Sequence, residues 1–312
     1  MTIRSLRLLS TVVSGISTLL IPIILPYRIG LQYFNLYDFI STSTMSVSNL
    51  ADSGSSNSIL TSRPNRNHFL IWISIVYGLT VVCTFLFIGS NISFTLSSLL
   101  LTIALSANPL QQYFQKYGDA IHNTAIDKTL IVIKILGIFL LILTLLSTAK
   151  TGINAILLKE ILFLSPFLLL LINKRTFIGD KNISLKTFAR NLFSYSKPLY
   201  LVNLLSLLII FWERSLLIQD EAAYSKFAIS YRFILMLLIF SNVFSQYIIR
   251  DYSINKSIAM RTARNSLNLT FLFLSLFICI VPLVTSFYKI DILPSISVLL
   301  LYTPLQAISV IL

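Results

Sequence analysis

Apolar blocks separated by short polar segments recur along nearly the whole sequence. Residues 129–146 and 267–281 are two such blocks, and neither alternates apolar and polar positions as a half-buried strand does. A helix needs about 20 predominantly apolar residues to cross a bilayer. The pattern therefore predicts an all-α membrane protein with about ten transmembrane helices. The predicted spans are 8–26, 33–60, 69–89, 92–113, 129–148, 153–172, 198–218, 222–249, 267–287 and 292–312.

Composition agrees with a membrane protein and excludes several other classes. Apolar residues make up 56% of the 312 positions and charged residues only 11%, which is more apolar surface than a soluble domain of this length buries. The net charge of +13 comes from basic residues in short loops, a pattern that membrane topology explains and that does not indicate nucleic-acid binding. Cys83 and Cys279 both lie in apolar blocks, so they imply neither a disulfide framework nor a metal site.

The second predicted span is unusually polar. Residues 38–58 contain eight serines, two threonines, two asparagines and two aspartates, so an alternative interpretation is a long loop outside the membrane. The distribution of basic residues favours a span. With ten spans and a cytoplasmic N-terminus, sixteen basic residues fall on the cytoplasmic side and four on the outer side, as the positive-inside rule requires. A span this polar must face protein or a water-filled cavity.

The spans divide around one basic segment. Residues 173–197 carry six Lys or Arg and an apolar periodicity that predicts a short helix on the cytoplasmic leaflet. This linker separates an N-terminal lobe of six transmembrane helices, residues 1–172, from a C-terminal lobe of four, residues 198–312. The result is a two-lobed bundle with an incomplete second lobe, and truncation of a longer chain would explain that ending.

Ionisable side chains inside spans are candidates for function because they are costly to bury. Asp38 and Asp52 are fourteen residues apart, which places them on one helical face about 21 Å from each other. The purely structural alternatives are that Asp52 caps a kink and that Asp38 pairs with Arg28.

Basic groups in the second half supply the counterpart. Arg232 falls near the middle of the eighth span, where its planar guanidinium suits phosphate. Lys226 either lines the same cavity or extends to the outer headgroups. Arg214, beside Trp212, is either a cavity residue or an interfacial anchor. Lys134, Lys159 and Glu160 are interpreted as groups that extend to a membrane face or pair structurally.

The sequence carries no pattern typical of a catalytic or metal site. His68 and His122 have no partners at metal-ligand spacing, and no glycine-rich phosphate loop is present. We therefore expect no enzymatic activity and no cofactor.

Several short segments carry a family resemblance. They are residues 19–30 (LLIPIILPYRIG) followed by Tyr33 and Asp38, 52–54 (DSG), 196–199 (SKPL), Glu213 with Arg214, 223–224 (AY) and 231–232 (YR). The chain resembles the O-antigen and polysaccharide-biosynthesis flippases of the multidrug/oligosaccharidyl-lipid/polysaccharide exporter superfamily. Glu213 departs from the aspartate more usual in that pattern, and the acidic second span departs from a purely cationic cavity.

The resemblance implies a transporter of the bacterial inner (cytoplasmic) membrane. It would move an undecaprenyl-diphosphate-linked oligosaccharide from the inner to the outer leaflet by alternating access, with membrane lipids and other polysaccharide-assembly proteins as further partners. Two alternatives remain open: a cation-coupled multidrug exporter of the same superfamily, and an integral-membrane polysaccharide polymerase or ligase. The candidate substrate-binding residues are Arg28, Asp38, Asp52, Arg214, Lys226 and Arg232.

Overall fold

The computed structural model describes residues 3–52, 59, 63–89, 95–121, 123–172 and 184–232. Within these ranges the regular structure is entirely helical. Predicted spans nine and ten, the part of span eight beyond residue 232, and the side chain of Asp52 lie outside the described residues. The division into two lobes therefore stays a prediction.

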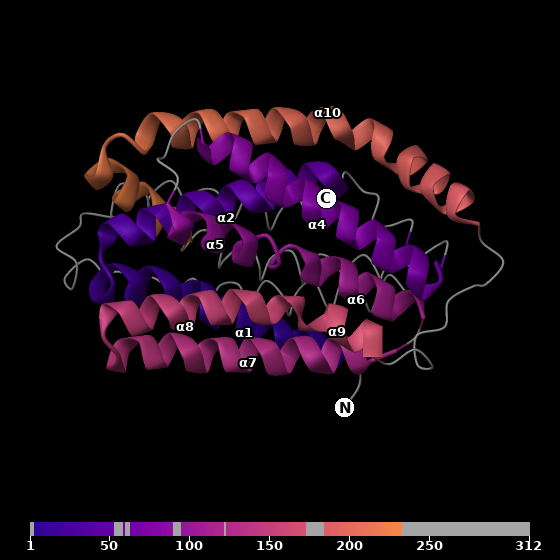
Figure 1. The fold of residues 1–312 in the computed structure, drawn as a ribbon, viewed down its shortest axis with the longest axis horizontal. Helices are drawn as coiled ribbons and strands as arrows, with labels where there is room; N and C mark the ends of the chain where they lie inside the picture. Colours follow the sequence, from indigo (N-terminus) through magenta and orange to yellow (C-terminus); the bar gives the residue numbers. More distant parts are fainter. Residues whose placement is uncertain are drawn as a thin grey trace, which may run out of the picture.

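The described helices lie side by side in one bundle, with α10 along one side and α1, α7 and α8 along the other (Figure 1). The elements are α1 (Ile3–Arg28), α2 (Leu31–Asp52), α4 (Arg66–Gly89), α5 (Leu96–Leu105), α6 (Leu110–Ala120), α7 (Ala125–Leu146), α8 (Ala149–Ile161), the short 3₁₀ helix η1 (Leu162–Leu164), α9 (Ser165–Ile172) and α10 (Leu185–Leu217). Residues 221–232 are also helical.

Three helical stretches are long and apolar enough to cross a membrane: Arg66–Gly89, Ala125–Leu146 and Ala149–Ile172. Large apolar side chains on two of them point outward, including Leu86, which is 73% exposed, and Phe139, which is 57% exposed. Apolar faces of this extent are covered by lipid or protein in stable molecules. The prediction of an all-α membrane protein is confirmed at this level.

Helix α2 is polar yet buried. Asn35, Asp38, Thr42, Ser43, Thr44, Ser46 and Ser48 all have less than 9% of their surface exposed. The helix packs against α1, α4, α5 and α10, and Ser48 accepts a hydrogen bond at its carbonyl oxygen from the Tyr113 hydroxyl at 3.1 Å. Polar side chains inside an apolar bundle must find such partners. The expectation that this segment faces protein is confirmed.

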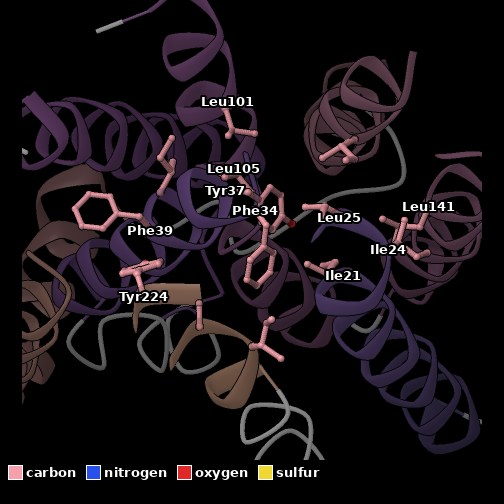
Figure 2. Packing of buried hydrophobic residues seen from close by; sticks show 14 of the residues in the cluster. Ile21, Ile24, Leu25, Phe34, Tyr37, Phe39, Leu101, Leu105, Leu141 and Tyr224 are labelled. Atoms are coloured by element: carbon pink, nitrogen blue, oxygen red, sulfur yellow. The ribbon is translucent and has the colours of Figure 1, made fainter. Parts of the chain in front are cut away.

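The main apolar core surrounds the N-terminal half of α2. In Figure 2, Phe34 and Tyr37 lie between Leu25 of α1 and Leu105 of α5. Phe39 contacts the ring of Tyr224 with 6.4 Å between centroids. This packing holds α2 between the two sides of the bundle and so fixes where its polar side chains point.

Two predicted boundaries differ in the structure. The interfacial helix expected in 173–197 and the seventh span from 198 form one helix, α10, which begins after the N-cap Ser184. The fourth span instead divides into α5 and α6, with a turn at 106–109. Pro109 lacks a backbone N–H and disfavours helical geometry at the preceding residue. The break frees Asn108 to reach another helix.

Close contact between α7 and α8 depends on Gly152. A Cβ atom at this position would lie 2.8 Å from Cγ2 of Thr144. We expect Gly152→Val to destabilise the protein by about 1–3 kcal/mol because the hairpin must open to accept it. Thermal unfolding in detergent measures the effect. Gly78→Val is the control, since nothing lies within 4 Å of its Cβ position, and equal melting temperatures for the two variants would contradict the prediction.

Candidate functional site

Asp38 of α2 lies between two arginines at the centre of the bundle. Its Oδ1 accepts a hydrogen bond from Nε of Arg232 at 2.6 Å, and its Oδ2 accepts one from Nη1 of Arg214. The three side chains are 0%, 7% and 2% exposed for Asp38, Arg232 and Arg214. One carboxylate therefore joins α2 to α10 and to the helical segment 221–232.

Aromatic side chains complete the surroundings of Arg214. The Tyr224 hydroxyl accepts a hydrogen bond from its Nη1 at 2.9 Å and donates one to Oδ2 of Asp38 at 3.2 Å. The guanidinium carbon lies 4.8 Å from the ring centroid of Tyr231 and 5.2 Å from that of Phe227. Cation–π contacts stabilise a guanidinium that has lost its water. Arg214 is thus an interior group and not an interfacial anchor.

The segment 221–232 is held against α2 by polar contacts near its beginning. Nδ2 of Asn35 donates to the carbonyl of Glu221 at 3.1 Å, and the Ser225 hydroxyl donates to Oδ1 of Asn35 at 3.0 Å. Asp220 accepts hydrogen bonds from the first backbone amides of the segment, at Ala222 and Ala223, as an N-cap does. These contacts set the register that carries Arg232 to Asp38.

A second ionic cluster lies on α8. Oε1 of Glu160 accepts a hydrogen bond from the Tyr37 hydroxyl at 2.7 Å and forms an ion pair with Nζ of Lys159. Its Oε2 accepts a longer one from Nδ2 of Asn108 at 3.4 Å, and Oδ1 of Asn108 accepts one from Gln111. Glu160 is fully buried and Lys159 is 3% exposed. The structural pairing expected for these two residues is confirmed.

Tyr37 connects the two clusters. The guanidinium carbon of Arg232 lies 5.4 Å from the centroid of its ring, while its hydroxyl binds Glu160. The result is a continuous polar path from α10 through α2 to α8.

Lys134 of α7 is half-buried. Its Nζ donates a hydrogen bond to the Ser10 hydroxyl of α1 at 2.7 Å. Three residues further along α7, Gly137 leaves room for the stem of Lys159, whose Cγ would lie 3.2 Å from a Cβ atom there. Lys134 therefore points into the bundle, toward α1, and does not extend to a membrane face.

A cavity of about 90 Å³ lies where these groups meet. Its wall includes the cationic side chains Lys134, Lys159 and Arg232 together with hydroxyl and amide groups of α1 and α6. Within the described residues that form the wall, no carboxylate is present. The arrangement suits an anion or a strongly hydrogen-bonding group.

The six residues proposed from sequence fall into three sets. Asp38, Arg214 and Arg232 come together as described. Arg28 and Lys226 are exposed, and Nε of Arg28 donates to the carbonyl of Ser147 at 2.9 Å. The alternative pairing of Asp38 with Arg28 is wrong because Asp38 binds the other two arginines. The sixth residue is Asp52, and its side chain lies outside the part of the chain that the structure describes.

Several site residues were not singled out from sequence. Tyr37 was not among the candidates, Tyr224 entered only through the family resemblance, and Lys134, Lys159 and Glu160 were expected to extend to a membrane face or to pair structurally. A signal was present, since three ionisable residues interrupt otherwise apolar blocks. The sequence does not show which side of each helix faces the interior. That orientation decides whether a charged side chain reaches lipid headgroups or a cavity.

No known family model, curated protein or solved structure matches the chain.

Proposed function

We propose that this chain is a transporter that moves an undecaprenyl-diphosphate-linked oligosaccharide from the cytoplasmic to the outer leaflet by alternating access. It would span the bacterial inner membrane about ten times in two lobes, with its N-terminus in the cytoplasm. The observation that carries the proposal is the buried pair of arginines held by one carboxylate beside a polar cavity.

The physical basis is competition for the arginines. A guanidinium fork binds phosphate oxygens in the same geometry as carboxylate oxygens. A diphosphate that reaches Arg214 or Arg232 can replace Asp38, which in turn frees α2 from α10 and from 221–232. Substrate binding would thus favour a second arrangement of helices, as alternating access requires. The polyprenyl chain would stay in lipid.

The same contacts disfavour Asp38 and Glu160 as the coupling acids of a cation-coupled exporter. A coupling acid must be free to take up a proton or metal ion. In the described part of the chain both oxygens of Asp38 bind arginine, and Glu160 binds Lys159. These two carboxylates are therefore already neutralised by protein cations.

Export of lipid-linked sugar in cells tests the proposal. The chain is expressed in a bacterium that lacks its own flippase for a surface polysaccharide, and outer-leaflet lipid-linked oligosaccharide is measured. We expect Arg232→Gln to lower export at least about tenfold, since a hydrogen bond to a charged group contributes about 1.5–3 kcal/mol.

Asp38 keeps Arg214 as a partner in this variant, so the fold should persist, and membrane levels of the protein verify that. Arg190→Gln is the control because Arg190 is exposed on α10. Export that is equal in the two variants would refute the role of Arg232, and no export by the unmodified chain would refute the transport function.

A further inference from the structure

Three cations from three separate elements face one cavity. Lys134 comes from α7, Lys159 from α8 and Arg232 from the segment 221–232. Lys159 and Arg232 are buried and Lys134 is half-buried. Removing such charges from water is costly unless an anion or a hydrogen-bond network compensates them. The anions and hydrogen-bond acceptors that contact these cations therefore show whether the protein alone compensates their charge or a ligand is needed.

The protein compensates these charges only in part. Lys159 is paired with Glu160, and Arg232 is paired through Nε with Asp38. Nη2 of Arg232 is buried without a hydrogen-bond partner. Lys134 donates to the neutral hydroxyl of Ser10, and the nearest acid on its own helix, Asp127, lies two turns away.

The remaining polar groups of the wall are hydroxyls and amides, from Ser14, Ser17, Thr18, Asn108 and Gln111. The Thr18 hydroxyl donates to the Ser14 carbonyl. The amides of Asn108 and Gln111 each use one N–H, toward Glu160 and Asn108 respectively, and each keeps a second N–H. Hydroxyl and amide groups beside cations are typical ligands of phosphate oxygens. A volume of about 90 Å³ has room for several waters or for one group of phosphate size. Gly137 preserves that space, since a larger residue would meet Lys159.

We propose that this cavity is a binding site for a single phosphate-type group, held by Lys134, Lys159 and the free Nη2 of Arg232. The identification of that group as the proximal phosphate of the lipid-linked substrate rests on the proposed function. Binding of a phosphate anion as such does not. A bound phosphate would stabilise Lys134 more than the other two cations, because Lys159 and Arg232 are each paired with a carboxylate and Lys134 binds a neutral hydroxyl.

Binding of inorganic phosphate to the purified full-length chain tests the site. Isothermal titration calorimetry is performed in nanodiscs of neutral phosphatidylcholine at constant ionic strength. We expect saturable binding to the unmodified chain. Lys134→Met should weaken the affinity at least about tenfold, whereas Lys134→Arg, which keeps the charge, should stay within about threefold of the unmodified chain. Lys150→Met removes the same charge from an exposed position and should leave binding unchanged.

The remaining outcomes separate the proposals. No phosphate binding by the unmodified chain, or equal binding by Lys134→Met, would overturn the site.

A second titration, in nanodiscs that contain phosphatidylglycerol, identifies the source of the phosphate group. Retained binding supports a site for a substrate phosphate, whereas competition by that lipid would assign it to a headgroup and overturn the substrate assignment. Export that persists in Lys134→Met although phosphate binding is lost would refute the assignment of the site to the substrate phosphate, and would leave both the phosphate site and the transport function standing.

Discussion

Replacing Asp38 with asparagine is expected to lower the free energy of unfolding by about 3–5 kcal/mol, the cost of leaving a buried ion pair without one partner. Asparagine has nearly the same shape, so packing is preserved while two buried guanidinium groups lose their counter-charge. The amide oxygen of the asparagine can still accept a hydrogen bond from one arginine, but its NH2 group faces the N–H donor of the other arginine and repels it. Thermal and chemical unfolding in detergent micelles measures the loss.

Glu213→Gln is the matched control for Asp38→Asn. It removes one acidic charge from an exposed position on α10, next in sequence to Arg214, and should change stability by less than about 0.5 kcal/mol. A cycle with Arg232→Gln adds a sharper comparison. Because Asp38 and Arg232 are in contact, the double variant should cost less than the two single changes together, by about 0.5–3 kcal/mol. Strict additivity would contradict the proposed coupling.

Glu160→Gln is the second change with a large expected effect. The amide can still accept the hydrogen bond from the Tyr37 hydroxyl, so the main loss is the charge opposite Lys159. We expect a loss of about 3–5 kcal/mol on the same grounds, measured by unfolding in detergent.

The double variant Lys159→Met, Glu160→Gln distinguishes charge from packing. Methionine keeps the apolar stem against Gly137 and removes the ammonium, so no unpaired charge is left. Replacing both partners of a buried pair is often nearly neutral, and the double variant should therefore be more stable than Glu160→Gln alone. If it is equally unstable or worse, the contribution of Glu160 is not that of a counter-ion.

The membrane character and the interior position of α2 could be predicted from sequence. Long apolar blocks allow only helices in lipid, because each helix satisfies its own backbone hydrogen bonds. In a membrane-embedded bundle, Asp38 and the serines of the same helix cannot face hydrocarbon without partners, so their burial against protein was expected. Arg214 and Arg232 were candidates for the same reason, although the sequence left open an interfacial position for Arg214.

The pairing of these groups could not be predicted. Asp38 meets Arg214 and Arg232 across 176 and 194 residues of sequence, and helical periodicity says nothing about contacts at such separations. The two exposed candidates, Arg28 and Lys226, are basic like the buried Arg214 and Arg232, so residue type does not separate the two pairs. Only the packing of α10 and of 221–232 against α2 separates the buried cations from the exposed ones.

For Lys134, the sequence and the tertiary structure each determine a different property of the side chain. The sequence by itself determined that a charged residue interrupts an apolar helix and that this helix is long enough to span a membrane, because composition alone sets the cost of transfer into lipid. The tertiary structure decided that its side chain turns inward to Ser10 and the cavity. That direction depends on which face of α7 packs against α1, and this contact forms only when two helices about a hundred residues apart in sequence assemble.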